Sequence, residues 1–361
     1  MTVQKEKKQI LRLLFWESTI KCNLACAHCR RIESEETACQ DLSTLDAKFL
    51  IQQTAALGKE QSMMPVMVFS GGEPLCRGDL FELINLSATL GIIPALATNG
   101  TLINSDNANQ ILESGVKRVS VSLDGATAEV HNKLRQLTGS FERAIEGIGY
   151  LKELKIPFQI NMTLTRHNAH QLGDIYNLAK SLGAVAVHIF MLVPVGCGTQ
   201  LADTDMLAPE QYEQKMMEIH KLDLLGQLEM KVTCGPHYER VKRQERASST
   251  IKVHPGNKHI QSKGCLAGLG VLFVGHQGDI FPCGYLPIKC GNVLEDKLTD
   301  VWYNNYDLAR MRNENELEGK CGVCGYRQVC GGCRGRAYSA TGNYMAEEPF
   351  CAYVPQNALH K

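Results

Sequence analysis

Between residues 11 and 192 the chain alternates short apolar runs with amphipathic segments, and this alternation restricts the fold more than any other feature. The apolar runs predict strands at 11–17, 65–70, 92–97, 118–123, 158–164 and 185–192. Apolar residues at helical spacing predict helices at 46–57, 80–90, 106–114, 141–151, 171–182 and 209–225, the first capped by Ser43 or Thr44. Strands and helices that alternate in this way form a parallel sheet with right-handed crossovers, so we expect an α/β fold.

A cluster of three cysteines follows the first predicted strand. Cys22, Cys26 and Cys29 lie within eight residues, in a C-x3-C-x2-C spacing. Sulfur ligands select zinc, Cu(I) or an iron–sulfur cluster, and zinc usually takes four ligands in closely spaced pairs. No obvious fourth ligand lies nearby, and core thiols do not cluster in this way. The triad therefore indicates a [4Fe–4S] cluster with one iron left open.

Polar and glycine-rich loops follow three of the other predicted strands. They are Gly71-Gly72-Glu73-Pro74, Thr98-Asn99-Gly100 and the stretch with Ser122 and Asp124. Paired glycines let a backbone approach a ligand closely, and barrel enzymes place their chemistry at the carboxyl ends of strands. Each loop could also be an ordinary turn, and Asp124 could be a helix cap.

Taken together, the triad and these loops resemble the radical S-adenosylmethionine (SAM) superfamily. The resemblance implies a partial (β/α)6 TIM-type barrel, open on one side, whose cluster binds SAM through its open iron. It also implies a set of SAM-binding residues, namely Gly71, Gly72, Glu73, Pro74, Asn99, Ser122, Asp124 and Arg135. The glycine-rich loop would hold the amino group of SAM, Ser122 and Asp124 the ribose, and Arg135 the carboxylate. His28 stands where many members carry an aromatic residue near the adenine.

Cysteines return in number from residue 265. Cys265 and Cys283 bracket an apolar, glycine-rich hairpin, and Cys321, Cys324, Cys330 and Cys333 form a C-x2-C-x5-C-x2-C array before Cys351. A pair of zinc knuckles stays open as an interpretation. Seven cysteines exceed one four-ligand site, so they suit two centres, or one complete and one incomplete centre.

This second array resembles the SPASM extension of radical SAM enzymes, which carries auxiliary [4Fe–4S] clusters. The resemblance implies an outer cluster bound by Cys321, Cys324, Cys330 and Cys351. It implies an inner cluster bound by Cys265, Cys283 and Cys333, with a missing or variable fourth ligand. Cys333 departs from the usual spacing after Cys330, Cys290 is a possible substitute ligand, and Cys197 is expected to be a bystander.

Composition and boundaries set the remaining expectations. We expect a barrel over 1–200, a bridging region over 201–263 and a cluster-binding extension over 264–361. The 38 basic and 38 acidic residues balance, which argues against nucleic acid or an anionic membrane as a partner. The charged start MTVQKEKKQI lacks the apolar core of a signal peptide, and no apolar run is long enough for a membrane helix. Fifteen cysteines then favour cluster ligation in a reducing cytoplasm over a disulfide framework.

Several strings extend the resemblance towards one group of this superfamily, the heme b synthases of the siroheme-dependent pathway. They include LRLLFWESTIKCNLACAHCR, HIFMLVPVG and CGPHYER. The resemblance implies that two propionates of iron-coproporphyrin III become vinyl groups by oxidative decarboxylation through a 5′-deoxyadenosyl radical. An auxiliary cluster would accept the surplus electron, a ferredoxin or flavodoxin would reduce the enzyme, and the enzyme would be a monomer. Candidate contacts to propionate or iron are Arg166, His167, His188, His237, Arg240, Arg334 and Arg336.

Three other functions stay open. A related tetrapyrrole enzyme, of the heme d1 type, would share most of these strings. A peptide-modifying SPASM enzyme is disfavoured because only about ten residues precede the first strand, where such enzymes commonly carry a peptide-recognition domain. A non-enzymatic iron–sulfur or zinc carrier is disfavoured because it has no use for a SAM site.

Overall fold

The computed structural model describes residues 9–31, 40–248, 263–356. The charged segment 1–8 and the last part of the expected bridging region lie outside the described residues. The first half of the fold contains β1 (Leu13–Glu17), α1 (Thr44–Gln61), β2 (Val66–Ser70), α2 (Leu80–Thr89), β3 (Ile93–Thr98), α3 (Ser105–Glu113), β4 (Arg118–Ser122), α4 (Ala128–Arg135), α5 (Ser140–Glu153), β5 (Phe158–Leu164), α6 (Leu172–Leu182) and β6 (Ala186–Met191). The second half contains α7 (Pro209–Leu224), β7 (Glu229–Thr233), α8 (His237–Ser248), β8 (Val271–Val274), β9 (Asp279–Phe281), β10 (Gly291–Asn292), α9 (Leu298–Asn304), α10 (Tyr306–Arg312), α11 (Gly319–Gly322) and α12 (Arg334–Thr341).

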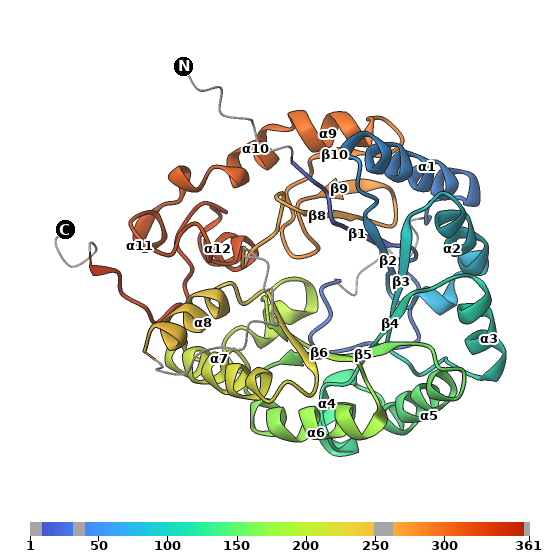
Figure 1. The fold of residues 1–361 in the computed structure, drawn as a ribbon, viewed down its shortest axis with the longest axis horizontal. Coiled ribbons are helices and arrows are strands. Elements are labelled where there is room, and N and C mark those ends of the chain that lie inside the picture. Colours follow the sequence, from blue (N-terminus) through green and yellow to red (C-terminus); the bar gives the residue numbers. More distant parts are fainter. Residues whose placement is uncertain (1–8, 32–39, 249–262, 357–361) are drawn as a thin grey trace.

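One sheet runs through the whole molecule. Its strand order is β10-β9-β8-β1-β2-β3-β4-β5-β6-β7, and every neighbouring pair from β8 to β7 is parallel. The sheet curls into a barrel, and the helices form a ring around its outside (Figure 1). The predicted partial barrel with a cysteine-rich extension is confirmed.

The sequence predicted the first six strands well, but it missed the edges of the sheet. Each of the six strands lies within two residues of its predicted bounds, and so do the helices apart from α1, which runs longer at both ends. Two strands outside the predicted barrel extend it, since β7 pairs with β6 and β8 pairs with β1. The sheet therefore crosses both expected domain boundaries. Helix α4 was also missed, because its sequence AEVHNKLR is largely polar.

Alternate residues on the strands face different surroundings. On β5, Ile160, Met162 and Leu164 belong to the hydrophobic core, whereas Gln159, Asn161 and Thr163 line a cavity inside the barrel. This is the period of two that a strand imposes. Most of the apolar core therefore lies between the sheet and the helices, and part of the barrel interior is left polar and open.

Local contacts explain how helix α1 begins. The Ser43 hydroxyl accepts a hydrogen bond of 3.2 Å from the Asp46 backbone N–H, so Ser43 rather than Thr44 is the cap. Further along α1, Gln53 bonds to Val293 and Leu298 in the C-terminal part of the chain. Helix α1 thus joins the barrel to the extension. None of the described helices is both long and apolar enough to cross a lipid bilayer.

The end of α1 gives a test of stability. Gln61 is buried, and its side chain bonds both the N–H of Leu11 (2.9 Å) and the C=O of Leu11 (2.8 Å). Gln61→Ala should lower the free energy of unfolding by about 2 kcal/mol, because two buried backbone groups lose their partners. Gln52→Ala, on the exposed side of the same helix, is the control. Anaerobic urea unfolding measures both, and equal stabilities would contradict this role of Gln61.

Candidate active site and iron–sulfur centres

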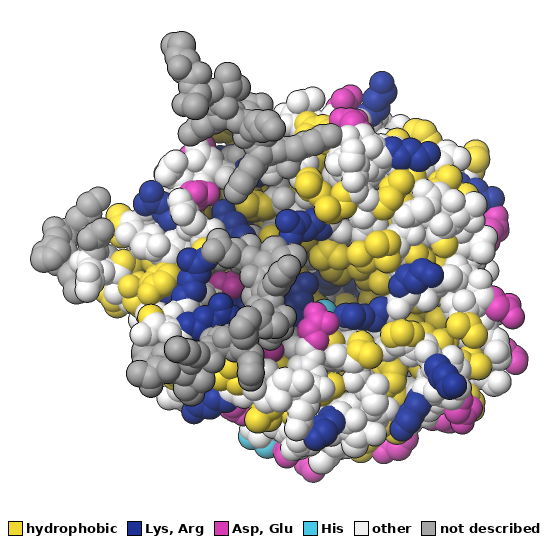
Figure 2. All heavy atoms as spheres, viewed as in Figure 1, with side chains coloured by type: hydrophobic (Ala, Val, Ile, Leu, Met, Phe, Trp, Pro, Cys, Tyr) yellow, Lys and Arg dark blue, Asp and Glu magenta, His cyan; other side chains and the backbone are white. Residues whose placement is uncertain are grey.

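A cavity of about 750 Å³ occupies the inside of the barrel. Strands β1 to β8 all contribute to its wall, and so do the triad Cys22, Cys26 and Cys29. Figure 2 shows a hollow near the middle of this face, with hydrophobic and Lys or Arg side chains around it. The cavity therefore brings the cysteine triad and the barrel strands into one candidate site.

The cysteine loop, residues 22–29, is held to the barrel by its backbone and by the side chains of Asn23 and His28. The N–H of Ala27 donates to the C=O of Leu134 at 3.0 Å, and the N–H of Gly198 donates to the C=O of Cys29 at 3.3 Å. Burial raises the pKa values of the Cys22 and Cys26 thiols, although the Arg135 guanidinium 3.7 Å from Cys26 opposes this for Cys26. Thiols that sit close together on a loop, with cations beside them, fit a cluster that binds thiolates.

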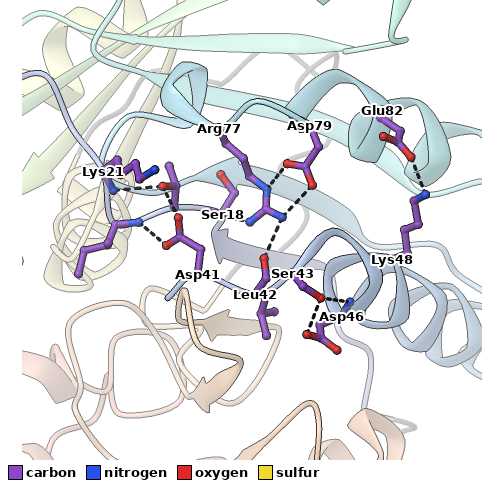
Figure 3. Close-up of polar contacts among 12 residues, drawn as sticks. Ser18, Lys21, Asp41, Leu42, Ser43, Asp46, Lys48, Arg77, Asp79 and Glu82 are labelled. Carbon is purple, nitrogen blue, oxygen red and sulfur yellow. Dashed lines mark hydrogen bonds and ion pairs between the residues drawn. The ribbon is translucent and has the colours of Figure 1, made fainter. Parts of the chain in front are cut away.

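Two charged side chains fix the segment that leads into this loop (Figure 3). Arg77 donates to the carbonyl oxygens of Ser18 (2.6 Å) and Leu42 (3.0 Å), and it pairs with Asp79. Asp41 accepts hydrogen bonds from the Thr19 hydroxyl (2.6 Å) and the Ile20 N–H (2.8 Å). The bonds of Arg77 and Asp41 therefore fix the path of the chain between β1 and the cysteine loop.

The Gly71-Gly72 pair packs directly on this segment. The N–H of Gly72 donates to Thr19 O (2.7 Å), and the N–H of Glu73 donates to Lys21 O (2.8 Å). A methyl group on Gly72 would collide with the carbonyl oxygens of Ile20 and Lys21. The glycines are needed for this backbone-to-backbone approach, which brings the two loops together.

The side chain of Glu73 lies behind the cavity wall. Its carboxylate accepts hydrogen bonds from the Thr98 hydroxyl (2.8 Å), the Asn99 N–H (2.8 Å) and the Leu75 N–H (3.2 Å). Burial raises its pKa to about 7, although these three bonds oppose the shift. Glu73 thus ties its own loop to the end of β3.

Asp124 is also buried behind the wall. Its carboxylate lies 2.7 Å from Arg135 Nε and 3.3 Å from His28 Nε2, and it accepts from the Thr163 N–H. Burial alone would raise the pKa of Asp124, but the charge of Arg135, then that of His28, outweighs burial and lowers it. In this arrangement Asp124 holds two side chains that reach the cavity, Arg135 and His28, and its expected contact with ribose stays a prediction.

The expected SAM-binding residues therefore divide into two groups. The cavity wall contains Gly71, Gly72, Asn99, Ser122 and Arg135. Glu73, Pro74 and Asp124 are buried and support them from outside the wall. These roles stay predictions, but the two groups are joined by the bonds described above.

The thiols expected to bind the outer cluster lie together at a separate small cavity. Its lining includes Cys321, Cys324, Cys330 and Cys351, which is the predicted set, together with Lys320 and Arg327. Backbone N–H groups of Glu348 and Tyr326 donate to the sulfurs of Cys321 and Cys324, each at 3.4 Å. Such bonds favour thiolates.

The three thiols expected to bind the inner cluster lie on the large cavity. Cys265, Cys283 and Cys333 all line it, and sequence analysis missed a fourth thiol there, Cys234. Cys234 directly follows β7, so recognising β7 as a barrel strand would have revealed it. Within the described ranges, no three Cys, His, Asp or Glu side chains surround a point closely enough for one metal ion. Ligands of a [4Fe–4S] cluster each bind a different iron, so they need not meet at one point.

Three of the seven candidate substrate contacts are committed elsewhere in the structure. Arg240 pairs with Glu213, Arg336 pairs with Glu348, and Arg334 bonds backbone carbonyls. Of the seven candidates only His188 lines the cavity. The cations that do line it are Arg30, Arg31, Lys117, Arg118, Arg135 and Lys231.

Comparison with known families matches two parts of the chain. Residues 16–179 match the Radical SAM superfamily, and residues 265–325 match an iron-sulfur cluster-binding domain. Solved structures share the fold at low identity. The Streptococcus suis protein SuiB, bound to its precursor peptide SuiA, has a TM-score of 0.74 at 19% identity over 96% of this chain and 76% of its own. The structure of anSMEcpe with bound AdoMet has a TM-score of 0.71 at 20% identity over 94% of both chains.

Curated relatives share more of the sequence. The AdoMet-dependent heme synthase of Methanosarcina barkeri is 42% identical over 95% of this chain and 97% of its own. That of Oleidesulfovibrio alaskensis is 42% identical over 96% of this chain and 88% of its own. The pre-heme d1 synthase of Dinoroseobacter shibae is 29% identical over 94% of this chain and 85% of its own.

The contact between the two loops predicts the effect of one methyl group. Gly72→Ala should lower SAM cleavage by about 100-fold, because it displaces the cysteine loop from the glycine pair. Gly149→Ala, in α5, meets nothing within 4 Å and should leave cleavage unchanged. The measurement is 5′-deoxyadenosine formed by anaerobically reconstituted protein. Equal activity of the two variants would show that the close approach is not needed.

Proposed function

This chain belongs to the radical SAM superfamily, and from that premise we propose that it decarboxylates iron-coproporphyrin III. Two propionate side chains become vinyl groups, which gives heme b. The observation that carries this proposal is the identity of 42% with AdoMet-dependent heme synthases along nearly the whole chain. Identity to a pre-heme d1 synthase is much lower.

The cofactors set the type of reaction. A [4Fe–4S] cluster on Cys22, Cys26 and Cys29 would, together with SAM, supply a 5′-deoxyadenosyl radical that can remove a hydrogen atom from a propionate. In this proposal Arg135 binds the SAM carboxylate, which is supported by Asp124, whose carboxylate lies 2.7 Å from Arg135 Nε and holds the guanidinium. Asn99 and Ser122 offer polar groups on the same wall. The chain's own part in this chemistry is to hold these groups around one cavity.

The charge of the cavity supports a tetrapyrrole with several carboxylates. Its volume lies within the range of about 300–1,000 Å³ that is common for small-molecule sites. Among the described residues, six Lys or Arg side chains line it, against one carboxylate, that of Glu229. Three of the six are ion-paired, namely Arg30, Arg118 and Arg135, and the other three make no ion pair among the described residues. A site with this balance of charge attracts an anionic substrate.

One group of side chains fits a propionate in particular. His188 on β6, Lys231 on β7 and Arg118 on β4 all reach the cavity. Burial lowers the pKa of His188 to about 3, helped by Lys231 and Arg118, so the ring is neutral at pH 7. The Gln159 amide N lies 2.8 Å from His188 Nδ1 and 2.9 Å from Asn161 Oδ1.

These contacts assign the proton of His188. An amide nitrogen donates, so His188 Nδ1 accepts and Nε2 carries the hydrogen. Nε2 has no hydrogen-bond partner among the described residues. Two contacts were expected for His188, with a propionate or with iron. A bond to iron needs a free lone pair on Nε2, whereas a protonated Nε2 can donate a hydrogen bond to a propionate. The propionate contact is therefore favoured.

The proposal also covers the electron donor and the oligomeric state. A low-potential donor such as ferredoxin or flavodoxin supplies electrons, and the enzyme works as a monomer. A single chain contains every residue that the proposal uses.

The function is tested with the reconstituted protein, SAM, dithionite and iron-coproporphyrin III under anaerobic conditions. Mass spectrometry should show a product that has lost two CO2 units and the associated hydrogens, together with 5′-deoxyadenosine. Deoxyadenosine without any change of the porphyrin would contradict the substrate and point to another tetrapyrrole, of the heme d1 type, or to a peptide.

The cationic group gives a second test. Lys231 makes no ion pair in the part of the chain that the structure describes. The charge of Glu229 acts on it, but Glu229 pairs with Arg118, so the Lys231 ammonium can meet a ligand. Lys231→Gln should weaken binding of iron-coproporphyrin III by about tenfold, because one charged contact is lost. Lys48→Gln, whose side chain pairs with Glu82 outside the barrel, is the control. A spectroscopic titration that gives equal affinities would exclude Lys231 as a substrate contact.

A further inference from the structure

We propose that Cys234 is the fourth ligand of the inner auxiliary cluster, which closes that cluster with four protein thiolates. The other three ligands are the thiols of Cys265, Cys283 and Cys333. The inference concerns the centre itself and does not depend on which substrate the enzyme takes.

The four thiols form one connected group. The side chains of Cys234 and Cys333 share a hydrogen bond, and the charge of Cys283 also acts on Cys234. Cys265 and Cys283 interact with each other and with Cys333. All four line the same cavity. Cysteine thiols that are linked in this way suit a [4Fe–4S] cluster, in which each thiolate binds a different iron.

These thiols come from distant parts of the chain. Cys234 follows the carboxyl end of β7, Cys265 precedes β8, and Cys283 follows β9. Cys333 immediately precedes α12. Side chains that are brought together from four separate segments are placed by the fold, and the carboxyl end of a barrel strand is where functional residues gather.

The backbone of Cys234 adds a second observation. Its φ is 57°, in the left-handed region that costs a non-glycine residue about 1–2 kcal/mol. The neighbouring Gly235 could not carry a side chain without meeting Val232, Met216 and Met191. Close packing therefore holds Cys234 in this conformation, with its thiol beside that of Cys333, and such outliers cluster at functional sites.

The remaining described thiols do not compete for this position. Cys290, the substitute that the sequence suggested, is buried elsewhere, where Asp307 and Arg312 act on it and its sulfur donates to Ile288 O. Cys197 donates to Arg31 O. Cys76 lies beside Glu73, and neither Cys76 nor Cys290 lines the cavity. Of the thiols in the described ranges, Cys234 alone joins the inner three.

A closed ligand set limits what this centre can do. The triad leaves one iron open, which SAM needs, whereas four thiolates leave no iron of the inner cluster free to bind substrate. The inner cluster then has only an electron-transfer role on the cavity wall, and the substrate is held by the cations and His188.

The test separates a closed cluster from an open one. In a full-length protein with Cys22, Cys26 and Cys29 replaced by Ala, only the auxiliary clusters remain. Adding cyanide to the reduced protein should leave its electron paramagnetic resonance (EPR) spectrum unchanged. The further change Cys234→Ala should make part of the spectrum respond to cyanide, or should remove about four irons per chain. Cys290→Ala in the same background is the matched control and should behave like the parent.

Three results would overturn the proposal. The parent could already respond to cyanide, the Cys234→Ala variant could keep an unresponsive spectrum and full iron content, or Cys290→Ala could produce the change instead. Far-ultraviolet circular dichroism of each variant distinguishes a failure to fold from loss of a ligand. If Cys234→Ala does not fold, Cys234→Ser in the same background replaces it, with a shifted EPR signal expected and an unchanged one contradictory. Neither the EPR spectrum nor the iron content involves a porphyrin. A result that contradicts the role of Cys234 would therefore not contradict the proposed decarboxylation.

Discussion

Parallel strand pairing at the two edges of the barrel is the constraint on which the rest of the molecule depends. Strand β7 adds to β6, and β8 adds to β1, so segments after the predicted barrel become part of its wall. Because of this pairing, thiols before β8 and after β7 reach the cavity that also contains the cysteine triad. The iron–sulfur extension is therefore joined to the barrel by the hydrogen bonds of the sheet. Residues of the barrel and of the extension together line the cavity.

Buried charge is used in two distinct ways around this cavity. Some charged groups are neutralised inside the protein, as Arg336 is by Glu348 at 2.9 Å, and they hold α12 in place. Others face the cavity without an ion pair among the described residues, as Lys231 does, and the neutral ring of His188 faces it with Nε2 unpartnered. A buried pair is satisfied by its own geometry, whereas an unpartnered group on a cavity wall is available to a ligand.

Local sequence predicted much of the fold, because the first six strands are apolar runs between recognisable turns. It also brought the triad and the Gly71-Gly72 loop together correctly, since both follow neighbouring strands. Strand β7 was missed because EMKVT carries two charges and is not an apolar run, and with it Cys234 and Lys231 were missed. The positions of Glu73 and Asp124 could not be read either. Whether a carboxylate points into a cavity or behind its wall depends on partners such as Thr98 and Arg135, which lie far along the chain.

The central claim is that substrate lies inside the barrel, between the triad and the inner thiols. The most direct measurement is an iron anomalous-scattering map from crystals of the cluster-loaded protein with iron-coproporphyrin III. The account predicts an isolated iron within the cavity, close to His188 and Lys231, in addition to iron at the triad and at the two sets of auxiliary thiols. An isolated iron outside the barrel, or no iron at Cys234, Cys265, Cys283 and Cys333, would contradict it.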